Sequence, residues 1–134
     1  MTDSTRATIW HILNNAFHKV LHTVQADVPT VRMSAGHSQN EAFLFRAFAQ
    51  YSAGGIVVVI SFDVQVQNLQ VHVFGDLAWE DGLIIKSLME TVIGSEACDE
   101  QFLISQAYTF ASQCEHNAFL IASALGEGRK EARK

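Results

Sequence analysis

The chain has 134 residues, of which 49% are apolar and 17% charged, and its formal net charge is −5. This length and composition indicate one folded domain with a sizeable core. Nucleic acid is excluded as a favoured partner because a negative surface repels phosphate backbones. The longest apolar run, Ile56–Ile60, is too short to cross a bilayer, and Met1–Arg6 does not have the pattern of a secretory signal, so we expect no membrane association.

The charge is unevenly spread along the chain. Residues 127–134 carry four basic and two acidic side chains, so residues 1–126 hold twelve acidic and five basic ones. We expect a single domain over residues 1–126 and a flexible charged tail over residues 127–134. Cys98 and Cys114 fall in one expected helix, about 24 Å apart, which rules out a disulfide between them. Free thiols are typical of a reducing compartment, so a cytoplasmic location is expected.

The clearest element is an N-terminal helix. Asp3 or Ser4 can cap its start, and Asp27–Pro29 ends it because a residue before proline disfavours the helical region. Its apolar positions recur every three to four residues and form one stripe: Ile9, Ile12, Leu13, Ala16, Phe17, Val20, Leu21 and Val24.

Strands are expected next. Thr30–Gly36 alternates apolar and polar residues, which is typical of a strand. Residues 41–51 fit two structures. Ser38 and Glu41 have the spacing of a capping box and favour a helix, whereas the apolar residues at every second position would share one face of a strand. We favour the strand.

Residues 56–66 and 69–75 predict a β-hairpin with a two-residue turn at Gln67-Asn68. The even positions of the first strand and the odd positions of the second are apolar and would form one buried face. The other face carries Ser61, Asp63 and His72, with Asp63 directly opposite His72.

A helix is expected after the hairpin. Asp76 would cap it, and Glu80 and Asp81 would lie in its first turn, where the helix dipole favours negative charge. Its apolar positions run from Leu83 to Ile93, and Gly94 would end it.

The last expected element is a long helix that begins at Ser95 and runs to about Leu125, before Gly126. The sequence therefore predicts an α+β fold. In it, a small antiparallel sheet of three or four strands packs with an N-terminal helix and two C-terminal helices.

His11, His18 and His22 lie on one face of the first helix, within about 40° of one another. Two of them, one turn apart, could share a transition metal, but no Cys, Asp or Glu of this helix faces the same way. A polar outer face explains them best, a protein contact surface is the alternative, and we predict no metal.

Ser61, Asp63 and His72 have the residue types of a hydrolytic triad. A nucleophilic serine lies on a strained turn beside backbone donors, however, whereas a mid-strand serine does not. An exposed pair of Asp63 with His72 explains the pattern as well. Cys114 and His116 diverge by about 200° on a helix and cannot form a dyad. With no phosphate loop or metal motif in the sequence, we predict no enzyme and no cofactor.

Between residues 76 and 100, seven acidic residues are opposed by one basic residue, Lys86. Capping of two helix starts explains most of these acids, but capping needs only one or two per start. The surplus is self-repelling unless something positive binds. We therefore expect a basic protein partner to bind a site of five residues: Asp76, Glu80, Asp81, Asp99 and Glu100.

The stretch Val73–Leu88, VFGDLAWEDGLIIKSL, resembles small bacterial immunity proteins of polymorphic or contact-dependent toxin systems. The likeness is a strand, then Gly-Asp-Leu, then Glu-Asp-Gly opening a helix, and it covers about sixteen residues. It implies an acidic cytoplasmic domain that neutralises a basic toxin, often a nuclease, by covering its active site. We predict such a non-catalytic inhibitor; the alternative is an acidic secretion chaperone or adaptor that binds an extended segment of its partner.

Overall fold

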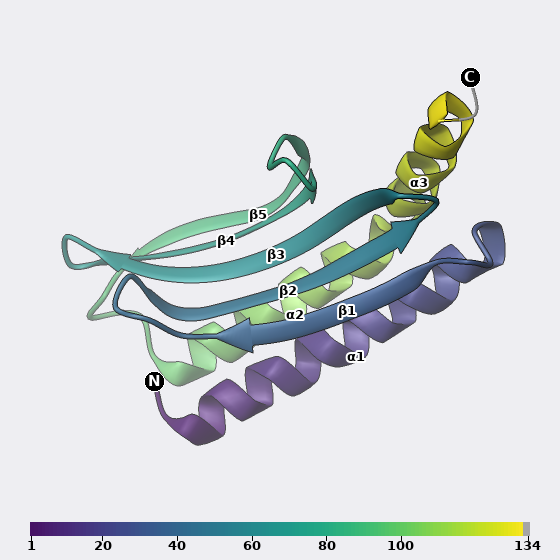
Figure 1. The fold of residues 1–134 in the computed structure, drawn as a ribbon. Coiled ribbons are helices and arrows are strands. Elements are labelled where there is room, and N and C mark those ends of the chain that lie inside the picture. The colour runs from purple at the N-terminus through teal and green to yellow at the C-terminus, as the bar shows by residue number, and fades with distance from the viewer. Residues whose placement is uncertain (133–134) are drawn as a thin grey trace.

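The computed structural model describes residues 1–132, and the side chains of residues 1–127. It has the α+β fold that the sequence predicts: an N-terminal helix, an antiparallel sheet and two C-terminal helices (Figure 1). The sheet has five strands rather than three or four. The elements are α1 (Asp3–Asp27), β1 (Arg32–Ser38), β2 (Phe43–Ala53), β3 (Ile56–Gln67), β4 (Gln70–Trp79), β5 (Ile84–Gly94), α2 (Glu100–His116) and α3 (Ala118–Ala132).

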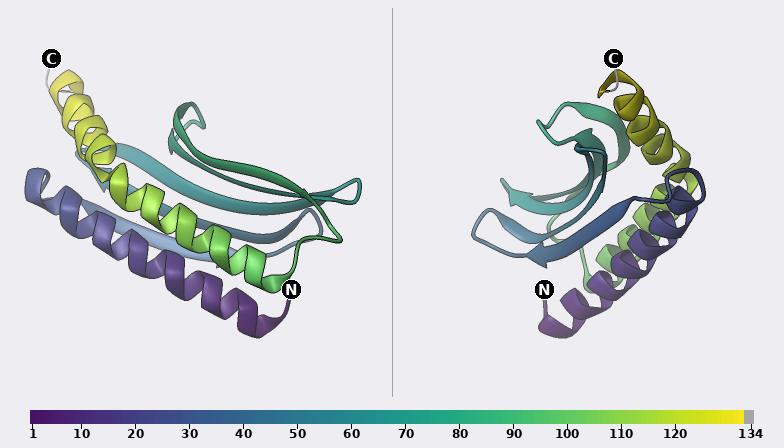
Figure 2. Two further views of the ribbon diagram at one scale, coloured as in Figure 1. Left: turned by 180° about the vertical axis from the view of Figure 1, so that it is seen from behind. Right: turned by 45° about the vertical axis from the view of Figure 1, so that its right-hand side comes forward.

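The sheet is a simple meander in which each strand pairs with the next, in the order β1-β2-β3-β4-β5. Helices α1 and α2 cover one face of it, side by side and roughly along the strands (Figures 1 and 2). The sheet curls away from the helices, so its uncovered face is concave (Figure 2). We call this uncovered surface the open face. In the described part of the chain, no helix has both the length and the apolar character needed to cross a membrane.

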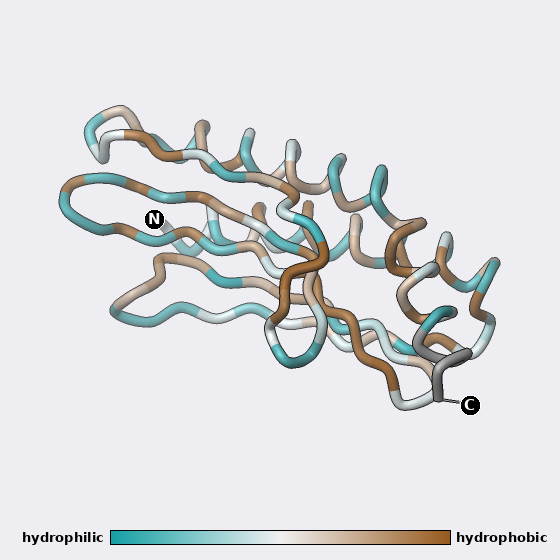
Figure 3. The backbone as a smooth tube through the Cα atoms, turned by 90° about the horizontal axis from the view of Figure 1, so that it is seen from above, coloured by the Kyte–Doolittle hydropathy of each residue, from teal (hydrophilic) through white to brown (hydrophobic). Residues whose placement is uncertain are grey.

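The core lies between the helices and the inner face of the sheet. The stripe predicted on α1 is buried, apart from the partly exposed Leu21. Every second residue of β2 from Phe45 to Ala53 is buried, which confirms the strand for this segment. The Tyr51 hydroxyl donates a hydrogen bond of 2.7 Å to the carbonyl of Phe17 and ties the sheet to α1. The apolar run Ile56–Ile60 is the long brown stretch close to the C-terminal helix in Figure 3.

The β3–β4 turn differs from the expected one by one residue. Asn68 and Leu69 are its central residues, and both have positive φ, 53° and 61°. A tight hairpin turn that follows the twist of its strands requires two such residues, and asparagine adopts this region readily. Leu69 is 81% exposed, so nothing holds its side chain in the core. Asp63 consequently pairs with Phe74, and not with His72 as predicted.

The expected helix from Asp76 to Gly94 is wrong. Asp76 lies within β4, and the segment Ile84–Gly94 forms the edge strand β5. The turn between the two strands contains Gly82, with φ +93°, and the Asp81 carboxylate accepts a hydrogen bond of 2.9 Å from the Leu83 amide. Pairing with β4 satisfies the backbone groups on one side of this segment, and that long-range interaction overrides the helical spacing of its apolar residues.

The C-terminal helices also differ from the expected one. Asp99, and not Ser95, caps α2, because its carboxylate accepts a hydrogen bond of 2.7 Å from the Phe102 amide. Asn117 separates α2 from α3, and its side chain donates back to the Gln113 carbonyl at 2.8 Å. Helix α3 does not stop at Gly126 but continues to Ala132.

Two further expectations concern the same part of the chain. The flexible tail predicted over residues 127–134 lies partly outside the described residues, which end at 132. Cys98 precedes α2 and is half-buried, whereas Cys114 is buried within α2. Both thiols are free, in agreement with the absence of a disulfide predicted between them.

The position of the α2 cap can be tested by two substitutions. Asp99→Ala removes the side-chain acceptor, and we expect it to lower the free energy of unfolding by about 1 kcal/mol. Ser95→Ala is the matched control, and we expect a change of only a few tenths of a kcal/mol because Ser95 lies before the helix. Urea titrations of both variants give these values. A larger effect at Ser95 than at Asp99 would contradict the assignment of the cap.

Candidate functional site

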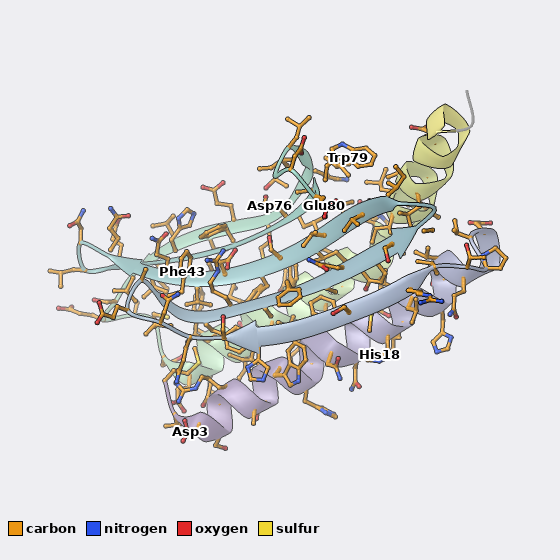
Figure 4. The ribbon with its side chains drawn as sticks, viewed as in Figure 1. Asp3, His18, Phe43, Asp76, Trp79 and Glu80 are labelled. Carbon is orange, nitrogen blue, oxygen red and sulfur yellow. The ribbon has the colours of Figure 1, made fainter. Side chains whose placement is uncertain are left out.

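The five acidic residues predicted to bind a partner do not form one surface. Glu80 and Asp81 lie in the β4–β5 turn, near the end of the sheet that faces α3, whereas the start of α2 lies near the N-terminus (Figures 1 and 4). The Thr2 amide donates a hydrogen bond of 3.0 Å to Glu100, which fixes Glu100 beside the N-terminus. The two groups therefore belong to opposite ends of the domain, and not to adjacent helix starts as expected.

Local structure explains the pair at the start of α2. Asp99 caps the helix, and Glu100 connects the helix to the first residues of the chain. Contacts with Thr5 and the hydrogen bond from the Thr2 amide hold the pKa of Glu100 below its usual range. Both carboxylates are engaged within the chain, which favours a structural role for them.

Asp76 lies on the open face and is the centre of a different group of acids. Cross-strand pairing defines two neighbouring rows of side chains on this face. One row runs across the sheet as Ser38, Arg46, Asp63, Phe74 and Glu90, and the next as Gly36, Phe48, Ser61, Asp76 and Ser87. Asp63, Asp76 and Glu90 thus come from three consecutive strands and face the same side.

An ion pair joins β2 to β3 on the open face. Arg46 Nε donates to Asp63 Oδ1 at 2.7 Å, and the guanidinium also lies 4.1 Å from the centre of the Phe43 ring. The side chain of Asp63 is 5% exposed and that of Arg46 is 47% exposed. Burial raises the pKa of Asp63, and the hydrogen bond and charge of Arg46 partly offset this rise. Arg46 thus opposes the effect of burial on the carboxylate of Asp63.

Asp76 is a half-buried carboxylate with no basic neighbour among the groups that shift its pKa. Desolvation raises the pKa of Asp76, a contact with Ser87 opposes this rise, and the charge of Glu90 adds to it. Asp76 in turn raises the pKa of Asp63. The one lysine or arginine of β3–β5, Lys86, faces the helices, where its Nζ donates to Asn117 Oδ1 at 3.0 Å. The β3–β5 half of the open face is therefore negative and would gain from a positive partner.

Apolar side chains surround these charges. Phe48 is 39% exposed and Val92 51% exposed, and Leu44 is also exposed at the end of β2. A hollow of about 220 Å³ lies between β2 and β3, lined by Ser38, Asn40, Arg46, Ala47, Phe48, Ser61 and Asp63. Exposed aromatic and aliphatic groups around a few fixed charges are typical of protein-binding surfaces.

The raised pKa of Asp76 predicts that its carboxylate lowers the stability of the fold at neutral pH. A carboxyl group whose pKa is higher in the folded state destabilises that state once it is ionised, and the penalty disappears as the pH falls below the folded pKa. We expect Asp76→Asn to raise the free energy of unfolding at pH 7 by no more than about 1 kcal/mol, because Asp76 is partly solvated. The gain should shrink in urea titrations near pH 4. A loss of stability at pH 7 would contradict this.

The histidines of α1 lie on its exposed outer face, as predicted (His18 is labelled in Figure 4). His18 Nδ1 lies 2.8 Å from the Asn14 carbonyl, and His11 lies 3.3 Å from the Asn15 amide. Among the side chains that the structure describes, those of residues 1–127, there is no group of three His, Cys, Asp or Glu close enough to hold a metal ion.

Ser61, Asp63 and His72 do not come together as a catalytic group. Asp63 is paired with Arg46, whereas His72 lies opposite Gln65 and places its Nε2 3.3 Å from Glu90. Ser61 and Asp63 line the hollow on β2 and β3, and His72 lines a different one near the β3–β4 turn. Burial raises the pKa of Cys114, so this thiol stays protonated in the core.

Sequence reasoning missed four residues of the open face: Arg46, Phe48, Phe74 and Glu90. A signal for two of them was present, because Arg46 and Phe48 fall between the buried positions of the strand alternative for residues 41–51. Glu90 could not be placed while its segment was taken as a helix.

Comparison with known proteins adds no relative to this description. No protein-family model, no curated protein and no solved structure matches the chain.

Proposed function

We propose that the protein is a non-catalytic binding protein that covers a basic protein partner with the open face of its sheet. The observation that carries this proposal is the pair Asp76 and Glu90 on neighbouring strands, beside the Arg46–Asp63 ion pair, on a concave surface that the helices leave uncovered. The only lysine or arginine of these strands, Lys86, is turned away toward Asn117, and the imidazole of His72 lies 3.3 Å from Glu90. Burial and, to a smaller extent, the charge of Glu90 raise the pKa of Asp76, and a positive partner would offset both effects.

An immunity-type inhibitor of a basic toxin is the form of this function that we favour. Such an inhibitor covers an active site with a preformed surface, and the strands of a five-stranded sheet hold their side chains in fixed positions. Opposite charges also raise the association rate, which suits a protein that must capture a toxin quickly. A cytoplasmic location belongs to the same proposal and is supported by the two free thiols.

The second candidate is an adaptor or secretion chaperone that binds an extended segment. The observation that favours it is the edge strand β5, which is eleven residues long and pairs on one side only, with β4. An added strand would pair with its free backbone groups. The two candidates differ in outcome: an inhibitor suppresses the activity of its partner, whereas an adaptor leaves that activity intact and changes the partner's solubility or export.

Site-specific photo-crosslinking in the native host tests the proposal. A benzophenone amino acid replaces Phe48 or Val92 on the open face. Tyr108 or Phe119 on the helices is the control, since both are more accessible than the open-face positions, at 61% exposure. We expect the open-face positions to crosslink to the same basic protein and the helix positions not to. Crosslinks to this protein only from Tyr108 or Phe119 would move the interface to the helices and overturn the proposal.

A further inference from the structure

A second concave feature lies at the end of the sheet, outside the acidic group on the open face. It is a cavity of about 600 Å³ where the β2–β3 turn, the β4–β5 turn and α3 meet. Its lining residues are Gly55, Ile56, Val57, Trp79, Glu80, Asp81 and Glu127. Figure 4 shows Trp79 and Glu80 at this end of the sheet, on the side toward α3.

The lining combines three kinds of group. Trp79 supplies a large aromatic ring, and Ile56 and Val57 supply aliphatic surface beside it. Glu80, Asp81 and Glu127 supply three carboxylates, and none of the lining side chains that the structure describes, up to residue 127, is basic. A ligand that satisfies all three kinds of group has an aliphatic body and a cationic head that lies against an aromatic ring.

The segment that carries Trp79 is held in place by its turn. The Trp79 amide donates a hydrogen bond of 2.9 Å to the Leu83 carbonyl, and the Gly82 amide donates one of 2.9 Å to the Trp79 carbonyl. The carboxylate of Asp81 accepts from the Leu83 amide. The backbone on both sides of Glu80 is therefore fixed before a ligand arrives, which lowers the entropic cost of binding.

We propose that this cavity binds an arginine side chain carried by a polypeptide. A guanidinium is planar, so it can stack on the Trp79 indole and still donate hydrogen bonds in its plane to Glu80 or Glu127. The ammonium of lysine is a compact, strongly hydrated charge and cannot make both interactions at once. A cavity of this volume also has room for the residues that flank the arginine. The inference deepens the proposed function, since the polypeptide would belong to the basic partner.

The probe is a blocked tripeptide, acetyl-Ala-Arg-Ala-amide, added to the full ¹⁵N-labelled chain. The chain has two tryptophans, so the indole N–H region of the NMR spectrum holds two signals, which Trp79→Phe assigns. Trp10 is a built-in control because it packs against His37, at 4.7 Å between ring centres, on the α1 side of the sheet. We expect a saturable shift of the Trp79 signal with a Kd on the order of 1 mM, and no shift for Trp10.

Two control peptides test whether the charge and the planar shape of the guanidinium both contribute to binding. The citrulline tripeptide keeps the shape of arginine without its charge, and the lysine tripeptide keeps the charge without the plane. We expect the citrulline peptide to bind about tenfold more weakly and the lysine peptide to bind about threefold more weakly than the arginine peptide. Equal shifts with arginine and citrulline would overturn the proposal.

Charge-matched variants locate the site. Glu80→Gln combined with Glu127→Gln removes two lining carboxylates, and Glu41→Gln combined with Glu96→Gln removes two exposed ones elsewhere. We expect about fivefold weaker binding for the first pair and no change for the second. No shift of Trp79, or equal effects of the two pairs, would refute this site. Either result would leave the open-face proposal standing, because crosslinking at Phe48 and Val92 does not depend on the cavity.

Discussion

Gly75→Ala is expected to lower the free energy of unfolding by about 3 kcal/mol, the largest effect that we predict for a single added methyl group. Gly75 lies on the inner face of β4, where Phe110 of α2 packs directly against its backbone. A Cβ atom at this position would collide with Cε2 of Phe110 and would lie only 2.8 Å from Cδ2 and 3.0 Å from Cζ. Phe110 is fully buried and packs against the tilted ring of Phe62 at 5.0 Å between ring centres, so it cannot move aside without disturbing the core.

Two comparisons separate this collision from a general effect of losing a glycine. Gly94→Ala, at the end of β5, places its Cβ in open space, and we expect a change within about 0.5 kcal/mol. In a Phe110→Leu background the obstructing ring is absent, so Gly75→Ala should cost less than about 1 kcal/mol there. Urea titrations of the single and double variants give these values. An equal cost of Gly75→Ala in both backgrounds would show that the Phe110 ring is not the cause.

Arg46→Ala is expected to cost about 2 kcal/mol at neutral pH because it leaves the Asp63 carboxylate buried without its partner. We expect a smaller loss of stability than for a fully buried ion pair because Arg46 is half exposed. The sign of the pH dependence follows from the raised pKa of Asp63. Without Arg46 that pKa rises further, so the variant loses stability above the new pKa and recovers it as the pH falls below it.

The matched controls for Arg46→Ala lie on the same face. Arg32→Ala removes a base from β1 that forms no ion pair among the described side chains, and we expect a change within about 0.5 kcal/mol. Asp63→Asn combined with Arg46→Ala removes both charges, and this variant should be more stable at pH 7 than Arg46→Ala alone. A cost of Arg46→Ala that does not change between pH 7 and pH 4 would show that packing, and not the unpaired carboxylate, is responsible.

Local patterns were sufficient for the elements whose apolar spacing fits one structure only. The stripe on α1 fits a helix alone, and the alternation from Ile56 to Val66 fits a strand alone. Residues 41–51 fitted both, and the regular burial from Phe45 to Ala53 follows the strand alternative. In these segments the face that each residue takes could be predicted before its packing partners were known.

Long-range pairing decided the rest. The apolar residues between Leu83 and Ile93 are spaced as on a helix, but β4 offers its backbone groups to this segment, and two irregularities in the β4–β5 pairing accommodate the mismatch with strand periodicity. The local sequence pattern of a segment does not show that another strand will offer its free edge for pairing. The expected partner site combined acidic residues from two helix starts. The segment of the first expected helix forms parts of β4 and β5 instead, so these residues do not lie together.

The open face could be anticipated only in part. Asp76 was identified from charge alone, and it does lie in an acidic group, but its neighbours are Asp63 and Glu90 from the adjacent strands. Asp99 and Glu100 were identified by the same argument and are engaged within the chain. Net charge in a stretch of sequence therefore indicated the sign of the surface, while the register of the strands determined which acids share it.

The most direct test of the proposed open-face interface is the association rate with the partner that crosslinking identifies. Asp76→Asn combined with Glu90→Lys changes the charge of the open face by +3, and Glu41→Gln combined with Glu96→Lys makes the same change elsewhere. At low salt we expect about tenfold slower association for the first pair, with a weaker salt dependence, and less than a twofold change for the second. Equal effects of the two pairs, or an unchanged rate for the first, would contradict an interface on the open face.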